Sequence, residues 1–447
     1  MKLQTIQLLR SLAAVLVAIL HAAGFERLML QEAGSDEAPL LNGLFLNGYG
    51  GVDLFFVISG FIMVWVTRTS RPSPGTSLSF LFARTTRVYP VWWFAAGLMT
   101  LYALNLQGAA ASPGSLEAEP ETYSLGYLVR SFLLLPQPDY PILSVGWTLI
   151  HEIYFYVVFA ALLLLPRAFL PLGLLVWGAI VIAASFLMPL PATAENLLVL
   201  AVHPMTMEFI LGAVIGLLVT SGVSWRGGSI MVIAAIWFTA ALCLQGTADE
   251  FALKWGRVLM FGFPCAALVY GAATLDIQRR TVWLLPALIG AFATGLMFQL
   301  NPAGLDITYA ERARQLIVPV LTGVLSAAAI ILAGWFGGRY IPLVTLRAGH
   351  AFKTIYTVAA RTGDWSYSLY LTHLFAFGLL KWIFAWLGAQ ASLAPIFAVG
   401  HPGGLGNTLF VVCGLTASLL GGFITYTLVE RPALAVAMSA RRALFRH

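Results

Sequence analysis

The chain has 447 residues, of which 60% are hydrophobic and only 10% are charged. A soluble protein carries about 25% charged residues, so this chain has too few charges to cover a water-exposed surface. Its 25 basic and 19 acidic residues give a net charge of +6 without a basic cluster, which excludes disorder and nucleic-acid binding. Apolar runs of about 20 residues, the length that crosses a bilayer, recur along the chain. The composition therefore predicts a polytopic membrane protein surrounded by lipid.

Twelve segments are apolar and long enough to be predicted as transmembrane helices. The first is expected to stay in the protein rather than to be cleaved as a signal, because His21 interrupts it and no small-residue cleavage triplet follows. An even number of spans places both termini on one side, and 18 of the 25 basic residues fall on that side, which the positive-inside rule assigns to the cytoplasm. We therefore expect an all-α integral membrane protein, a polytopic helical bundle with about 12 transmembrane helices and both termini cytoplasmic. The segments are 6–24, 49–67, 88–105, 147–165, 169–189, 204–221, 229–245, 257–275, 282–300, 315–336, 365–387 and 406–429.

Two stretches between these segments are not simple loops. The outer loop 106–146 is acidic, as is the outer loop Glu26–Glu37. The first of these loops contains the apolar piece Leu125–Pro136, which is too short to cross the membrane. We expect this piece at the membrane interface or folded back into the protein. The inner stretch Gly338–Gly363 mixes basic and aliphatic residues and predicts a helix lying on the cytoplasmic leaflet. The three cysteines lie inside apolar runs without the spacing of a disulfide framework or a metal site.

Charged side chains inside a membrane are costly, so each one is a candidate for function. Arg10 and His21 lie eleven residues apart, or about three turns, which puts both on one helix face with ~16 Å between them. We expect Asp53 and Glu152 at the same outer depth as His21, where a carboxylate would orient the imidazole as a general base. The alternative is that Arg10 is a positive-inside anchor and His21 an interfacial residue.

Further polar residues follow helical spacing. Ser366, Tyr370 and His373 stand at i, i+4 and i+7, a stripe that serves either interhelical hydrogen bonding or the site. Thr148 and Glu152 are also four residues apart and face the same way.

Other intramembrane or juxtamembrane groups give weaker signals. Arg84 and Arg87 precede the third segment and project together, either toward a phosphate-rich cofactor on the cytoplasmic side or toward anionic lipid. His203 and His401 lie near outer helix ends, where we expect solvated positions, and Glu208 receives no assigned role.

These residues, in this order, resemble the acyltransferase-3 family of integral membrane acyltransferases. The resemblance implies transfer of an acyl group, usually acetyl from cytoplasmic acetyl-CoA, to a carbohydrate hydroxyl at the outer face of a bacterial inner membrane. It also implies His21 as the essential catalytic residue and Arg84, Arg87 and Arg10 as the residues associated with the acyl donor. The sequence around Trp147 looks most like that of the exopolysaccharide O-acetyltransferase branch. The motifs are Arg10 and His21, GGVDLFFVISGF at 50–61, Arg84 and Arg87 before Pro90, GWTLIHEIYFY at 146–156, Glu208 before Leu211-Gly212, SYSLYLTH at 366–373 and Glu430-Arg431-Pro432.

The family core usually has ten spans, so the resemblance implies an insertion here. Residues 1–275 would form core helices 1 to 8, and residues 276–360 an inserted two-helix segment with a cytoplasmic interfacial stretch. Residues 361–435 would form the last two core helices, and residues 436–447 a basic cytoplasmic tail. An even insertion preserves the sidedness of everything after it.

The expected reaction uses His21 as general base, oriented by Asp53 or Glu152, with acetyl-CoA as donor and no metal. The substrate-binding or oxyanion candidates are Trp147, Ser366, Tyr370 and His373. An acetyl-His intermediate is an open alternative, and so is succinyl instead of acetyl.

The expected partners are a glycan acceptor, membrane lipid and polysaccharide synthesis machinery. The competing class is a transporter or exporter of a glycolipid or acyl group without chemistry, which intramembrane charges and twelve spans fit equally well. Against it stands the lack of internal repeats and of paired broken helices in the sequence. A purely structural subunit of polymer secretion is a third, weaker alternative.

Overall fold

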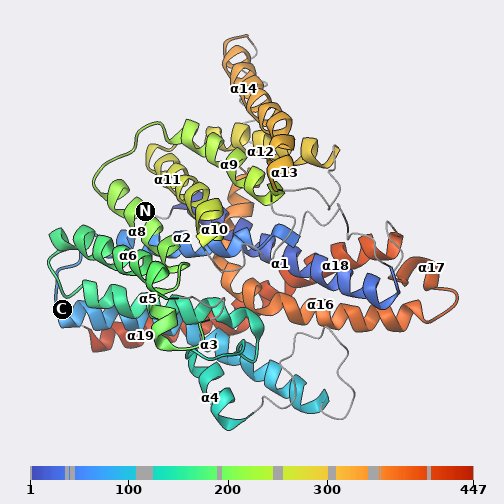
Figure 1. Ribbon diagram of the computed structural model, residues 1–447, viewed down its shortest axis with the longest axis horizontal. Coiled ribbons are helices and arrows are strands. Elements are labelled where there is room, and N and C mark those ends of the chain that lie inside the picture. Colours follow the sequence, from blue (N-terminus) through green and yellow to red (C-terminus); the bar gives the residue numbers. More distant parts are fainter. Residues whose placement is uncertain are drawn as a thin grey trace.

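The computed structural model describes residues 3–35, 40, 46–106, 124–188, 194–244, 255–300, 309–340, 352, 354–399 and 404–445. All regular secondary structure in these residues is helical, which confirms the predicted all-α class (Figure 1). The elements are α1 (Gln4–Glu32), α2 (Gly50–Val66), α3 (Pro74–Leu106), α4 (Leu125–Leu133), η3 (Ser144–Gly146), α5 (Trp147–Leu162), η4 (Arg167–Phe169), α6 (Leu170–Leu187), α7 (Leu197–Val202), α8 (Thr206–Thr220), α9 (Gly227–Leu244), α10 (Trp255–Arg257), η5 (Val258–Gly262), α11 (Phe263–Gln278), η6 (Thr281–Trp283), α12 (Leu284–Leu300), α13 (Tyr309–Gln315), α14 (Ile317–Tyr340), η7 (Gly363–Trp365), α16 (Ser366–Gly388), α17 (Ala394–Phe397), α18 (Leu405–Thr425), η8 (Tyr426–Glu430) and α19 (Arg431–Leu444).

Ten helical segments in the described part of the chain are long and apolar enough to cross a membrane. They correspond to the first and to the fourth through twelfth predicted segments. The second predicted segment is α2, an apolar helix of only 17 residues, and the third is the C-terminal part of α3. Length and composition thus support ten of the twelve expected spans.

Two helices extend beyond their predicted bounds. α1 runs to Glu32, so Glu26, expected in an outer loop, is helical and buried, and its carboxylate accepts hydrogen bonds from Asn407 Nδ2 and from the Leu40 amide, each at 3.1 Å. The acidic stretches 36–39 and 117–121 lie outside the described residues. α3 starts at Pro74 instead of residue 88, because residues 74–87 lower the hydropathy but are helical, with the proline at the first helical position, where it is tolerated. Arg84 and Arg87, expected at a helix start, therefore lie inside α3.

α1 lies at the centre of the bundle, against α2, α11, α16 and α18 (Figure 1). Its N-terminus is held by a carboxylate from another helix. Thr5 donates to Asp276 at the end of α11, from its amide at 3.0 and 2.8 Å and from its hydroxyl at 2.7 Å. This contact satisfies amide groups that the helix start leaves without a partner and places negative charge at the positive end of the helix. The first turns of α1, which carry Arg10, are thereby fixed.

α2 and α8 approach each other through glycines. A methyl group on Gly60 would overlap the Phe209 carbonyl, and one on Gly212 would overlap the Val57 carbonyl. Small residues allow such close backbone contact between membrane helices. This contact fixes α2, whose middle carries residues of the candidate site.

α4 folds back against the middle of α3. Three aromatic side chains of α3 donate to carbonyl groups in the last turn of α4: Tyr89 Oη, Trp92 Nε1 and Trp93 Nε1, at 2.9, 3.1 and 3.0 Å. Their acceptors are the carbonyls of Leu133, Ser131 and Phe132. α4 therefore packs on α3 by one side only, and the choice between an interfacial and a folded-back position for Leu125–Pro136 stays a prediction.

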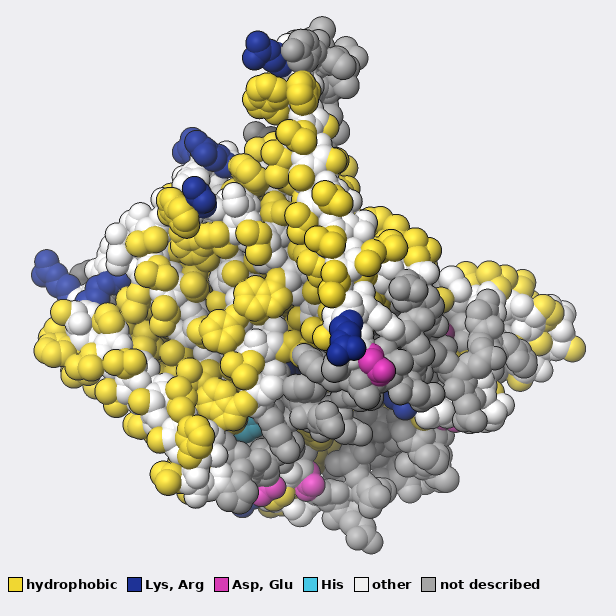
Figure 2. Space-filling model, turned by 45° about the horizontal axis from the view of Figure 1, so that its top comes forward, with side chains coloured by type: hydrophobic (Ala, Val, Ile, Leu, Met, Phe, Trp, Pro, Cys, Tyr) yellow, Lys and Arg dark blue, Asp and Glu magenta, His cyan; other side chains and the backbone are white. Residues whose placement is uncertain are grey.

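The segment expected as an insertion lies at the edge of the bundle. α12 and α14 pack against each other and against α9. Figure 1 shows that α14 extends away from the other helices and is not parallel to α1 or α16, and Figure 2 shows its largely apolar surface. Residues 341–351 lie outside the described part. Residues 354–362 are helical, and Tyr356 is buried with its hydroxyl 3.0 Å from Thr5 Oγ1, so this end packs on α1.

Candidate active site

A cavity of about 320 Å³ brings together the three arginines that the sequence singles out. Arg10 comes from the second turn of α1, and Arg84 and Arg87 come from the middle of α3. All three side chains are half-buried. Guanidinium groups bind phosphate oxygens bidentately, so the chemistry of this wall suits a polyphosphate ligand. The other walls are Leu3, Ile6, Gln7, Val52, Phe55, Phe56, Ile58, Ser59, Ile62, Trp65, Val66, Val88, Thr148, Leu149, Glu152, Tyr156, Tyr367 and Tyr370.

Glu152 supplies negative charge to the same cavity. Its carboxylate accepts hydrogen bonds from Ser59 Oγ at 2.9 Å and from the Tyr156 hydroxyl. The Arg84 guanidinium lies 6.0 Å from the centre of the Tyr156 ring. Ser59 follows Asp53 by six residues, or ~9 Å along the helix axis, so the two carboxylates do not lie at one depth as expected. Glu152 lines the same cavity as the three arginines.

A second buried carboxylate stands behind the arginines. Glu430 in η8 is 1% exposed and accepts a hydrogen bond of 2.6 Å from Ser368 Oγ. Arg10 and Arg87 are the basic groups that act on it electrostatically. No feature of the sequence indicates a role for Ser368. Glu430 stands out only as the first residue of the Glu430-Arg431-Pro432 motif.

Thr148 and Tyr370 line the cavity on α5 and α16. Their hydroxyl oxygens are 2.8 Å apart, and Tyr370 Oη also lies 2.9 Å from the Val145 carbonyl oxygen, to which it donates. Thr148 and Glu152 line the same cavity, which confirms that they share a helix face. Tyr370 precedes His373 by three residues, or ~4.5 Å along α16.

His21 and His373 form a pair. His21 Nδ1 lies 3.1 Å from His373 Nε2 and 2.9 Å from the Val17 carbonyl oxygen, and His373 Nδ1 lies 3.2 Å from the Leu369 carbonyl oxygen. A carbonyl only accepts, so His373 carries its proton on Nδ1, and its Nε2 accepts from His21 Nδ1. His21 therefore keeps its lone pair on Nε2, the form a general base needs. The expectation that Asp53 or Glu152 orients His21 is wrong in this structure, where His373 is the side-chain partner.

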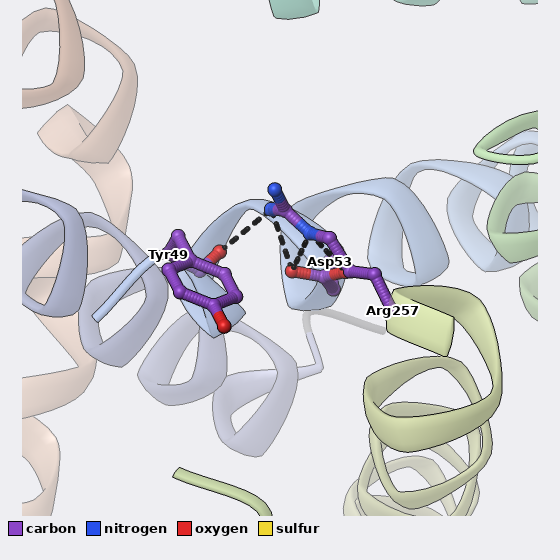
Figure 3. Close-up of polar contacts among 3 residues, drawn as sticks. All are labelled: Tyr49, Asp53 and Arg257. Atoms are coloured by element: carbon purple, nitrogen blue, oxygen red, sulfur yellow. Dashed lines mark hydrogen bonds and ion pairs between the residues drawn. The ribbon is translucent and has the colours of Figure 1, made fainter. Parts of the chain in front are cut away.

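Asp53 instead pairs with Arg257 at the end of α10 (Figure 3). Arg257 Nε donates to both Asp53 carboxylate oxygens at 2.9 and 3.1 Å, and Nη2 donates to Oδ2 at 2.8 Å and to the Tyr49 carbonyl at 3.0 Å. Both charged side chains are buried. A buried carboxylate without a cation would be strongly unfavourable, which explains the pairing. Arg257 stands at the start of a predicted segment, but nothing in the sequence places it against Asp53.

Glu208 lies beside this pair and is fully buried. Neither of its carboxylate oxygens has a hydrogen-bond partner among the described residues.

Other predicted residues lie outside the cavity. Trp147 packs edge-on against Phe56 and His151, with ring centres 6.3 and 5.8 Å apart. Ser366 Oγ donates to the Gly363 carbonyl at 2.9 Å, a contact at the start of α16. His203 is fully buried, with its ring centre 4.8 Å from that of His151, so the solvated position expected for it is wrong.

Two remaining questions concern a metal site and the position of His401. The described residues contain no group of three or more His, Cys, Asp or Glu side chains placed to hold a metal ion. His401 lies outside the described residues.

Comparison with known proteins gives two relatives and one family. Residues 3–296 match the family described as acyltransferase domain. The exopolysaccharide production protein ExoZ of Rhizobium meliloti is 28% identical over 397 residues, which cover 87% of this chain and 90% of that protein. The acyltransferase MdmB of Streptomyces mycarofaciens is 26% identical over 299 residues, which cover 63% of this chain and 73% of that protein. No solved structure matches the chain.

Proposed function

The chain belongs to the acyltransferase-3 family and is a multi-pass membrane acyltransferase, and from that premise we propose that it moves an acetyl group from cytoplasmic acetyl-CoA to a hydroxyl of an extracytoplasmic or lipid-linked polysaccharide. The main support for this proposal is the cavity that is lined by Arg10, Arg84 and Arg87 and also by Tyr370. Tyr370 lies one helical turn from His373 of the histidine pair. The resemblance to an exopolysaccharide production protein supports a glycan acceptor.

The donor would lie with its phosphates on the three guanidinium groups. Arg10 and His21 share a helix, and eleven residues of α1 separate them by ~16 Å, a span suited to an extended pantetheine arm. The thioester would then reach the wall formed by Thr148 and Tyr370, next to the histidine pair. Glu152 would keep its contacts with Ser59 and Tyr156 and limit the net positive charge of the cavity.

His21 would act as the general base. Its Nε2 takes the proton of the acceptor hydroxyl while that oxygen bonds to the thioester carbonyl carbon. The carbon–sulfur bond then breaks, and the thiolate of CoA receives the proton from His21 Nε2, so the imidazole returns to its starting form. His373 holds Nδ1 of His21 throughout, which keeps the reactive nitrogen in place.

Initial-rate kinetics separate direct transfer from an acetyl-His intermediate. Direct transfer needs both substrates bound together and gives intersecting double-reciprocal lines, whereas an intermediate gives parallel lines and donor exchange without acceptor. His21 Nδ1 is engaged by His373 and the Val17 carbonyl, so Nε2 remains as the one nitrogen that the general base of direct transfer needs.

We also propose that α2 and α3 complete a set of twelve spans in a bacterial inner membrane, with both termini in the cytoplasm. The C-terminal α19 carries Arg441 and Arg442 in its last turn, as the positive-inside rule favours. In this orientation the arginine cavity faces the donor pool, and polysaccharide synthesis machinery would deliver the acceptor at the other face. Family membership disfavours a transporter without chemistry, because a carrier has no use for an acyl donor.

The test uses purified protein in nanodiscs with radiolabelled acetyl-CoA. We expect saturable binding by the wild type, a Kd at least tenfold higher in Arg84→Gln, and slow release of free CoA that falls about 10²- to 10⁴-fold in His21→Ala. Arg27→Gln, which changes an exposed arginine of α1 outside the cavity, and His151→Gln are the matched controls. Full CoA release by His21→Ala would overturn the mechanism, and absence of binding by the wild type would overturn the donor.

A further inference from the structure

A second pocket lies where α4 folds back on α3. Its volume is about 360 Å³, within the range of about 300–1,000 Å³ typical of small-ligand sites. It is lined by Ser124, Tyr127, Arg130, Gln137 and Asp139, together with Gly126 and Pro138. None of these residues lines the arginine cavity, so the two pockets are separate.

The short helix α4 presents a different surface on each side. Leu125, Val129 and Leu133 follow one another at intervals of four residues and are exposed, as on a lipid-facing side. Tyr127 is buried on the opposite side, and the exposed Arg130, three residues before Leu133, lies at the edge of the apolar stripe; both line the pocket. The pocket is therefore formed beside the apolar stripe of α4, between the buried Tyr127 and the exposed Arg130.

The pocket contains polar groups that still need partners. Gln137 is 4% exposed, its Nε2 donates to Ser131 Oγ at 3.3 Å, and its Oε1 has no hydrogen-bond partner among the described residues. A buried acceptor left in this state costs about 1–3 kcal/mol, so a ligand hydroxyl that donates to it would be favoured. Arg130 offers up to five N–H donors and Asp139 offers two acceptor oxygens on the same wall.

The charges select the class of ligand. One guanidinium and one carboxylate give the wall no net charge, and the carboxylate of Asp139 would repel the phosphate of a lipid headgroup. A neutral polyhydroxyl compound suits this mixture, because each hydroxyl both donates and accepts. The Tyr127 ring adds an apolar wall, while its hydroxyl is used in a 2.9 Å hydrogen bond to the Tyr140 carbonyl.

We propose that this pocket is the acceptor subsite and binds a neutral sugar unit of the glycan through its hydroxyl groups. This inference rests on the proposed acyltransferase function. The same segment connects the pocket to the reaction centre: the Ile142 amide donates to Ser131 Oγ at 3.2 Å, and the Val145 carbonyl accepts from Tyr370. A glycan held at Gln137 and Asp139 would thus lie on the segment that contacts Tyr370, outside the lining of the donor cavity.

The experiment measures CoA release from acetyl-CoA by nanodisc protein as a function of glycoside concentration. The probes are methyl α-glucopyranoside, methyl β-galactopyranoside and a neutral tetrasaccharide. The variants are Asp139→Asn, which removes a charge at constant shape, and Gln137→Leu, which removes the unpartnered carbonyl. Glu195→Gln is the control, an exposed acidic residue of another loop that does not line the pocket.

We expect the half-saturating glycoside concentration to rise at least tenfold in both pocket variants, with the maximal rate and the KM for acetyl-CoA within twofold of the wild type. Unchanged glycoside dependence in both variants would overturn the subsite, and so would a wild type whose CoA release responds to no glycoside. A pocket variant that alters only the response to phosphatidylglycerol in the nanodisc would assign the pocket to lipid and also overturn it. Acetyl-CoA binding without glycoside tests the proposed function alone, so the two failures are distinguishable.

Discussion

At the residue scale, His373 and not a carboxylate lies against the candidate base. Its Nε2 is 3.1 Å from His21 Nδ1, and its side chain is fully buried. An imidazole partner fixes the tautomer of His21 without the electrostatic stabilisation that a carboxylate gives to the imidazolium. This arrangement leaves Nε2 of His21 outside the contacts of the pair.

We therefore predict that His373→Gln lowers kcat about 10- to 100-fold, a part of the 10²–10⁴ that a general base contributes. The KM for acetyl-CoA should change less than twofold, because His373 does not line the arginine cavity. Steady-state CoA release in nanodiscs gives both values. His151→Gln changes another buried histidine and should leave both constants within twofold, and an equal loss in the two variants would contradict a positioning role for His373.

For the Asp53–Arg257 pair we predict a role in the stability of the protein and not in the reaction. Breaking a buried ion pair by removing one partner costs about 3–5 kcal/mol, because the other charge stays uncompensated. Asp53→Leu and Arg257→Leu should each lower the Tm in detergent strongly, and the double variant should be more stable than either single one. If Asp53→Leu unfolds at the wild-type temperature but loses CoA release, Asp53 acts in catalysis and this assignment fails.

At the element scale, the contact between α2 and α8 depends on glycine. An added methyl at Gly212 would meet the Val57 carbonyl, which is backbone and has little room to move. We predict that Gly212→Ala destabilises the protein by about 1–3 kcal/mol through overpacking. Gly97→Ala is the matched control, because nothing lies within 4 Å of its added methyl and an alanine there favours the helix. Thermal unfolding of the two variants in one detergent decides the matter, and equal Tm values would refute the close contact.

The sequence predicts faces of helices better than partners between helices. Thr148 with Glu152 follows from a helical repeat within one element, and the structure confirms that they share a face. The partner of Asp53 is 204 residues away, and that of His21 is 352 residues away. Such pairs depend on how helices pack, which a local pattern does not contain.

Hydropathy also locates membrane segments rather than helix ends. The third predicted segment starts at residue 88, but the helix starts at Pro74, because residues 74–87 are helical although they are less hydrophobic than a membrane segment. The same difference moves Arg84 and Arg87 from a helix end to the wall of a cavity. The candidate donor site was thus predictable in its residues and not in its geometry.

At the scale of the whole molecule, the proposed reaction requires that donor and acceptor reach the centre from opposite faces. The arginine cavity is lined by the beginning of α1 and by α2 from Val52 to Val66, whereas the α4 pocket lies on a different segment. Both chain termini lie toward the same end of the bundle in Figure 1, as an even number of spans requires.

We predict that residues at the two ends of the bundle label from opposite sides of the membrane. The background is a variant with Cys243, Cys265 and Cys413 replaced by serine or alanine, since these are the free cysteines of the described residues. A cysteine introduced at Ser439, exposed on α19, should resist a membrane-impermeant maleimide in intact cells and react after lysis. A cysteine at Asp139, exposed beside the α4 pocket, should react in intact cells. Labelling of both positions from one side would contradict the proposed orientation and remove the separate approach of donor and acceptor.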